Sequence, residues 1–265
     1  YNSSIEEVKD KLARLVRYSD PDQKKTTLFI WPEGIFTGFS YSEISQFSGL
    51  IKNNFTENHL ILFGINTLDK NSGEYFNSLV IVNNKFKILH QYNKKKLVPF
   101  GEFLPFEEVL NKLGLKKITQ GHGSFSKGEI QENILFNNLN ILPLICYEII
   151  FPELTQRASS QTNLIVNISE DGWFGNSIGP HQHFAKAIFR SIENNSFLVR
   201  SANKGISAII NNKGEIIKKL NTYEVGNIEM DIPLLQSEYK NKNDLIFFIL
   251  LFTYLFIFLI FKNKN

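Results

Sequence analysis

The stretch ILPLICYEIIFPE, residues 141–153, decides the class of fold. Its short apolar run predicts a buried strand that ends at Cys146, the only cysteine among 265 residues. The helix-like segment FPELTQRASSQ and the strand-like segment TNLIVNIS follow it. This strand–helix–strand order predicts an α/β fold. Taken alone, a cysteine at the end of a buried strand is most often a small apolar core residue.

The sequence on both sides of this unit continues the pattern. An amphipathic helix is predicted over residues 4–18, with Ser4 as its N-cap. Hairpins between the later strands predict a mixed sheet that is covered by helices. The other predicted strands are 26–32, 59–68, 75–84, 85–92 and several within 197–220. The other predicted helices are 106–113 and 180–195.

The composition excludes several classes of function. A net charge of +3 with scattered lysines gives no basic stripe, so no nucleic-acid partner is expected. One cysteine excludes an internal disulfide framework and a cysteine-based zinc site. No carboxylate or cysteine stands at ligand spacing around His181 and His183, which favours structural or hydrogen-bonding roles for both. No metal and no cofactor are predicted.

The C-terminal segment LIFFILLFTYLFIFLIF, residues 245–261, predicts a transmembrane helix. Its 17 residues are uncharged and would extend about 26 Å as a helix, near the lower limit for crossing a bilayer core. The alternative is a buried core helix, although a soluble helix would normally carry a polar face. Lysines lie on both sides of the segment, so the distribution of positive charge alone does not set its orientation.

Three chemically versatile residues each follow a predicted buried strand: Glu33, Lys94 and Cys146. Functional groups converge at strand ends in α/β sheets. A cysteine thiolate can attack a carbonyl, and a buried carboxylate such as Glu33 can take the thiol proton. The ammonium group of Lys94 can stabilise the resulting oxyanion, together with the backbone N–H that follows the nucleophile. Each signal is weak alone, and the combination predicts a catalytic triad.

Four segments then resemble a known family. WPEG, YNKKKLVPFGEFLPF, ICYEIIFPE and the long stretch from NISEDGWFG to SANKG are similar to the nitrilase, or carbon–nitrogen hydrolase, superfamily, and within it most closely to the apolipoprotein N-acyltransferases. The resemblance implies a four-layer αββα sandwich. It also implies that Glu33, Lys94 and Cys146 are the catalytic triad. Three further family positions map onto Glu102, Tyr147 and Glu148, which are predicted to support the triad.

The resemblance implies a two-step acyl transfer at the bacterial inner membrane, with the catalytic domain facing the periplasm. Cys146 would take an acyl chain from a phospholipid as a thioester. The N-terminal diacylglyceryl-cysteine of an apolipoprotein would then accept it. Because both substrates carry acyl chains, apolar loop residues are expected at the mouth of the site, or alternatively in the core below it. These residues are Phe100, Phe103, Leu104, Trp173 and Phe174.

The chain departs from the family pattern at its N-terminus. Members carry transmembrane helices and a first strand ahead of the first helix, so the expected organisation is a catalytic domain at 1–238 without that strand, a linker at 239–244 and a transmembrane helix at 245–261. A missing N-terminal transmembrane portion is thus a possible partner. Two alternatives stay open: an amidase of the nitrilase type that hydrolyses small amides, and an inactive membrane-tethered fragment.

Overall fold

The computed structural model describes residues 4–105, 124–129, 133–136, 138–156, 162–235 and 243–262. The helix predicted at 106–113 and most of the predicted linker lie outside these residues. The last part of the helix predicted at 151–161 also lies outside them.

The N-terminal half forms a four-stranded sheet with three helices on one face. The order is β1 (Thr27–Ile30), β2 (His59–Leu68), β3 (Tyr75–Asn83) and β4 (Ile88–Asn93), with β1 parallel to β2 and the other pairs antiparallel. Helix α1 (Ile5–Ser19) begins at the predicted cap, where Ser4 and Glu7 form a capping box. Helices α2 (Tyr41–Ile44) and α3 (Ser48–Asn54) were not predicted.

The second half forms a six-stranded sheet. Its order is β10 (Ile216–Leu220), β9 (Ser207–Ile210), β8 (Phe197–Asn203), β7 (Leu164–Glu170), β6 (Leu139–Ile145) and β5 (Ile134–Phe136). The three central strands β6, β7 and β8 run parallel, so their carboxyl ends share one edge of the sheet. Helices α5 (Pro152–Gln156) and α6 (Gly179–Glu193) follow β6 and β7 respectively. The predicted α/β class is confirmed.

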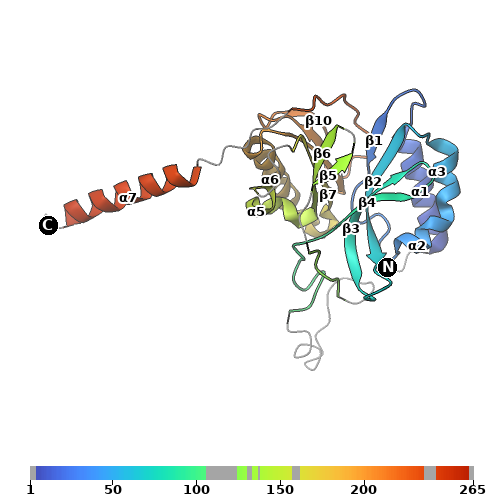
Figure 1. Cartoon of the computed structure of the whole chain (residues 1–265), viewed down its shortest axis with the longest axis horizontal. Coiled ribbons are helices and arrows are strands. Elements are labelled where there is room, and N and C mark those ends of the chain that lie inside the picture. The colour runs from blue at the N-terminus through green and yellow to red at the C-terminus, as the bar shows by residue number, and fades with distance from the viewer. Residues whose placement is uncertain are drawn as a thin grey trace.

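Three apolar cores give the domain four layers (Figure 1). In one, Leu12 of α1 and Ile51 of α3 pack against Phe63 of the first sheet. A second lies between the sheets, and a third joins α6 to the outer face of the second sheet. The layers are therefore helix, sheet, sheet and helix. This arrangement brings the carboxyl ends of β1, β4 and β6 to one region between the two sheets.

One predicted strand needs correction, and the C-terminal segment distinguishes between two predicted alternatives. The strand predicted to run to Pro32 ends at Ile30, and its side chains are half-buried because β1 is an edge strand among the described residues. The C-terminal segment is helical, as predicted, over α7 (Asn243–Lys262), but it is not the buried core helix of the alternative reading. Its apolar side chains are exposed, and α7 lies apart from both sheets in Figure 1. Among the described residues, it is the one helix that is long and apolar enough to cross a membrane.

Candidate active site

The structure brings Glu33, Lys94 and Cys146 together from three strands and both sheets. Glu33 follows β1, Lys94 follows β4 and Cys146 directly follows β6. Glu33 and Lys94 are 8% and 1% exposed, and Cys146 is half-buried. Nζ of Lys94 lies 3.7 Å from Oε1 of Glu33, and the charges of both residues act on the thiol of Cys146. Three positions that are far apart in the sequence therefore form one cluster.

A buried polar network holds the lysine. Nζ of Lys94 donates a hydrogen bond of 2.7 Å to Oε1 of Glu102, whose Oε2 accepts the backbone N–H of Val98 at 2.9 Å. Nδ2 of Asn77 on β3 lies 2.8 Å from Oε1 of Glu33 and 2.7 Å from Oε1 of Glu102. Asn77 thus links the two carboxylates that flank the ammonium group. It was missed in the sequence, where it stands next to the polar Ser78 and just before the apolar run of residues 79–82.

The electrostatics keep Lys94 charged. Burial opposes its charged form, but the nearby carboxylates of Glu33 and Glu102 outweigh burial and raise the pKa of Lys94. With both carboxylates ionised, the group carries one net negative charge. Lys94 can therefore act as a fixed positive charge but not as a base near neutral pH.

The nucleophile candidate has an unusual backbone and a protonated thiol. Cys146 adopts a left-handed conformation with φ 50°, which is uncommon for a residue with a side chain. Burial and the negative charge of Glu33 raise the pKa of Cys146 to about 12, against the opposing effects of Lys94 and a hydrogen bond with Ser169. The thiol therefore needs a base in order to attack, and the carboxylate of Glu33 lies in the same cluster.

Glu148 links the segment around Cys146 to the segment of residues 94–96 through hydrogen bonds. Its Oε1 accepts hydrogen bonds from the hydroxyl of Tyr92 and from the backbone N–H groups of Lys95 and Lys96, at 2.9, 2.7 and 3.0 Å. Its Oε2 accepts the backbone N–H of Ile145 at 2.8 Å. The side chain is fully buried, and burial raises its pKa. One carboxyl group thus fixes the positions of two adjacent loops.

A second carboxyl group lies beside Glu33. The backbone N–H of Glu170, the last residue of β7, donates to Oε2 of Glu33 at 3.1 Å. The side chain of Glu170 accepts hydrogen bonds from the backbone N–H of Gly172 at 2.8 Å and from Nδ2 of Asn203 at 2.6 Å. Burial raises the pKa of Glu170 to about 7. It packs against Gly34, where φ is 77° and a Cβ would lie 2.4 Å from Oε2 of Glu170.

Behind the cysteine lies a fully enclosed charged cluster that the sequence did not indicate. Nη2 of Arg200 donates to Oδ1 and Oδ2 of Asp171 at 2.9 and 2.7 Å, and Nη1 donates to Oδ1 of Asn167. Nδ1 of His183 lies 2.9 Å from Oδ1 of Asp171. Burial lowers the pKa of His183, and contacts with His183 and Arg200 lower that of Asp171 to about 2 against the effect of burial. The predicted hydrogen-bonding role of His183 is confirmed.

The predicted apolar contact residues divide into three groups. Phe100 and Trp173 are 47% and 64% exposed. Phe103 and Phe174 are half-buried, and the ring of Phe174 packs edge-on against His183. Leu104 is buried, so its side chain follows the core alternative. Tyr147, predicted as a supporting residue, is exposed beside Cys146, and its ring packs edge-on against Phe151.

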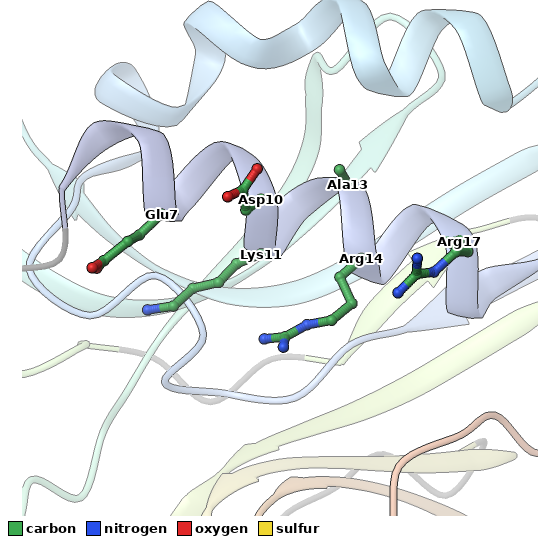
Figure 2. A pocket seen from close by; sticks show the side chains of 6 residues that line it. All are labelled: Glu7, Asp10, Lys11, Ala13, Arg14 and Arg17. Carbon is green, nitrogen blue, oxygen red and sulfur yellow. The ribbon is translucent and has the colours of Figure 1, made fainter.

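A shallow pocket elsewhere is not part of this site. It has a volume of about 490 Å³ and lies on the outer side of α1 (Figure 2). Its lining side chains all come from that one helix, and Glu33, Lys94 and Cys146 are not among them. The residues that line this pocket are Glu7, Asp10, Lys11, Ala13, Arg14 and Arg17.

Within the described residues, no group of three or more His, Cys, Asp or Glu side chains could hold a metal ion.

Comparison with known proteins gives both sequence and structural relatives. Residues 2–238 match the family model for carbon–nitrogen hydrolases. The chain is 35% identical over 214 residues to the apolipoprotein N-acyltransferase of Rhizobium leguminosarum bv. trifolii, covering 79% of this chain and 40% of that protein. It is 34% identical over 241 residues to the apolipoprotein N-acyltransferase of Bradyrhizobium diazoefficiens, covering 88% of this chain and 45% of that protein. The chain therefore spans less than half the length of these relatives.

Solved structures share the fold at low sequence identity. The carbon–nitrogen hydrolase of Helicobacter pylori G27 has a TM-score of 0.63 at 16% identity, covering 85% of this chain and 84% of that one. Nit3 of Saccharomyces cerevisiae, a member of branch 10 of the nitrilase superfamily, has a TM-score of 0.60 at 19% identity, covering 83% and 82%. The domain therefore has the nitrilase-superfamily α/β fold.

Proposed function

The chain belongs to the carbon–nitrogen hydrolase family, and from this premise we propose that it is an acyltransferase of the apolipoprotein N-acyltransferase type. It would move a fatty acyl chain from a phospholipid to the N-terminal diacylglyceryl-cysteine of an apolipoprotein. The observation that carries the proposal is the buried cluster of Glu33, Lys94 and Cys146 in a chain whose relatives, at 33–35% identity, bear that name. The proposal extends to the whole reaction, although the chain spans less than half of those relatives.

The first half-reaction would load the cysteine. Glu33 takes the thiol proton as Sγ of Cys146 bonds to the carbonyl carbon of the phospholipid ester. The negative charge that develops on the carbonyl oxygen is stabilised by the ammonium group of Lys94 and by the N–H of Tyr147. The ester C–O bond then breaks, and Glu33 returns its proton to the departing oxygen. A lysophospholipid leaves, and a thioester stays on Cys146.

The second half-reaction would transfer the acyl chain from Cys146 to an amine. The neutral α-amino nitrogen of the acceptor bonds to the thioester carbon, and Glu33 takes a proton from that nitrogen. The C–S bond breaks, the thiolate of Cys146 recovers the proton, and an amide forms. Because the thiol pKa is about 12, the sulfur is again protonated and the cycle closes. Glu33 thus acts as a base and then as an acid in each half-reaction.

The other buried polar residues would hold this arrangement. Glu102 fixes the ammonium group of Lys94, and Asn77 keeps both flanking carboxylates in place. Glu148 keeps the cysteine and lysine loops in register through its four hydrogen bonds. These are positioning roles, since none of these groups needs to contact the reacting carbon.

The membrane would supply the donor. We place α7 across the inner membrane because of its length, the uncharged apolar sequence of residues 245–261 and its exposure. The similarity to the apolipoprotein N-acyltransferases is the basis for proposing that the catalytic domain lies on the periplasmic side. The exposed rings of Phe100 and Trp173 would contact lipid near the mouth of the site. Phospholipid acyl chains would then reach Cys146 without leaving the bilayer completely.

Mass spectrometry of the protein after incubation with phosphatidylethanolamine in detergent tests the proposal. We expect one acyl chain bound to Cys146, sensitive to hydroxylamine and absent in the Cys146→Ala variant. A full-length relative, treated identically, verifies that the conditions support acylation. Turnover of a small amide without any acyl adduct from phospholipid would reject the transferase and favour the amidase.

A further inference from the structure

The peptide unit between Cys146 and Tyr147 is held from behind by its carbonyl group. Nε2 of His183 lies 3.1 Å from the carbonyl oxygen of Cys146. Because a carbonyl oxygen can only accept, the tautomer that bonds to it carries its hydrogen on Nε2. In the neutral ring Nδ1 is then an acceptor, and Nη2 of Arg200, 3.1 Å away, is its donor. Nδ2 of Asn167 makes a second, longer contact of 3.5 Å to the same oxygen. The orientation of this one peptide is therefore set by side chains from β7 and α6.

The histidine is itself rigidly placed. His183 is 4% exposed, and its other ring nitrogen lies 2.9 Å from Oδ1 of Asp171 and 3.1 Å from Nη2 of Arg200. Asp171 and Arg200 are each 1% exposed and joined by two hydrogen bonds. Since both ring nitrogens are engaged, the ring has little freedom to turn away from the cysteine.

The backbone at Cys146 makes such a support important. Cys146 has φ 50°, a left-handed conformation that is uncommon for a residue with a side chain. Rotation of the Cys146–Tyr147 peptide changes ψ of Cys146 and φ of Tyr147, and it would turn the N–H of Tyr147 to another direction. The hydrogen bond from His183 opposes that rotation because it fixes the carbonyl end.

The other end of the same peptide is the functional end. In a trans peptide the C=O and N–H groups point in opposite directions, and the described residues contain no cis peptide bond. Because the carbonyl group of Cys146 points toward His183, the N–H of Tyr147 points in the opposite direction. We infer that this is the side on which the proposed oxyanion forms. A hydrogen bond at the carbonyl also polarises the peptide and strengthens its N–H as a donor.

We propose that His183, oriented by Asp171 and Arg200, is a positioning residue that aims the N–H of Tyr147 at the oxyanion of the acyl-transfer step. This inference rests on the proposed covalent chemistry at Cys146. It assigns a function to a cluster that does not itself contact the reacting carbon.

Two substitutions of similar chemistry separate this role from simple support of the fold. In His183→Gln the side-chain amide nitrogen can occupy the position of Nε2 and still donate to the carbonyl of Cys146. In His183→Asn the shorter amide reaches only the position of Nδ1, so it can contact Asp171 and Arg200 but not that carbonyl. The same two changes at the exposed His181 serve as matched controls.

The assay compares two reactions of the same thiol in the full chain. Acylation by a p-nitrophenyl ester develops an oxyanion, whereas alkylation by iodoacetamide does not. We expect His183→Asn to slow acylation about 100-fold, the effect of losing one oxyanion donor, and His183→Gln to stay within about tenfold of wild type. Alkylation should change less than about threefold in both variants.

The outcomes are distinct. Equal acylation by the Asn variant and wild type would overturn the inference, and so would a parallel loss of alkylation, which indicates general disruption of the site. Because the activated ester does not require a phospholipid, the comparison works even if wild type fails to react with phosphatidylethanolamine. That failure would reject the proposed acyl donor and leave the test of His183 intact.

Discussion

Nζ of Lys94 lies 2.7 Å from Oε1 of Glu102 but 3.7 Å from Oε1 of Glu33. The ammonium group therefore donates its short hydrogen bond to one carboxylate and has the other as a near neighbour. This asymmetry separates two tasks. Glu102 anchors the charge, whereas each oxygen of Glu33 accepts one hydrogen bond, from Asn77 or from the N–H of Glu170, and has a second lone pair for the chemistry.

Removing the anchor should destabilise the whole domain. In Glu102→Ala the buried ammonium group of Lys94 loses its 2.7 Å partner, and breaking a buried pair in this way costs about 3–5 kcal/mol. Denaturant unfolding in detergent measures the loss. Glu129→Ala, which removes an exposed carboxylate, should change the unfolding free energy by less than about 0.5 kcal/mol. A cost below about 1 kcal/mol for Glu102→Ala would show that the pair is not a structural anchor.

Replacing Glu33 should make the thiol more acidic while removing acyl transfer. The negative charge of Glu33 is one of the causes that raise the pKa of Cys146 to about 12. In Glu33→Gln this repulsion is lost, so the pH at which iodoacetamide alkylation is half-maximal should fall. Acylation from an ester should nevertheless drop by about 10²-fold or more because the base is missing. An unchanged or higher midpoint pH would contradict the electrostatic assignment.

The carboxyl group of Glu170 should give the fold a pH dependence. Its folded pKa of about 7 lies above the ordinary value of 4.5, so its contribution to stability is present below pH 4.5 and is lost as the pH rises through 7. In Glu170→Gln this loss disappears. Relative to wild type, the variant should gain about 2 kcal/mol between pH 5 and pH 8, allowing for the partial exposure of the side chain. Thermal unfolding at the two pH values measures it, and a pH-independent difference between the proteins would refute it.

A charge in the middle of α7 should weaken membrane insertion. Phe252→Arg places a guanidinium group near the centre of the apolar span of residues 245–262, at a cost of about 3 kcal/mol. The fraction of protein that stays in vesicles after alkaline extraction should fall sharply. Phe252→Leu keeps the span apolar and should behave as wild type. Equal retention of the Arg variant would argue that α7 does not cross the bilayer.

The sequence was sufficient for the residues that stand at strand ends. Glu33, Lys94 and Cys146 each follow a predicted strand, and the topology brings the ends of these strands together even though the first one ends at Ile30 and not at Pro32. The helix at residues 5–19 was equally clear because its apolar period and its cap agree. Local pattern and global fold are consistent at all of these positions.

Partners within the core could not be predicted in the same way. Arg200 and Asn77 are polar residues within strands, but this does not identify Asp171 or Glu102 as the partner. The short helices α2 and α3, of 4 and 7 residues, are too short for a helical period to be recognised. Leu104 lies in a loop, where no periodicity distinguishes a buried from an exposed side chain.

The net negative charge of the Glu33–Lys94–Glu102 group also affects which molecules can bind near Cys146. In the proposed reaction a phospholipid ester would bring an uncharged carbonyl to the cysteine, whereas a free fatty acid would bring a carboxylate into a partly buried site that already has an excess of negative charge. Free fatty acids should therefore compete poorly for the site, even though their chains fit wherever the donor's chains fit. The site would thus resist inhibition by the product of its own unwanted hydrolysis, and it would select for intact lipid by charge as well as by shape.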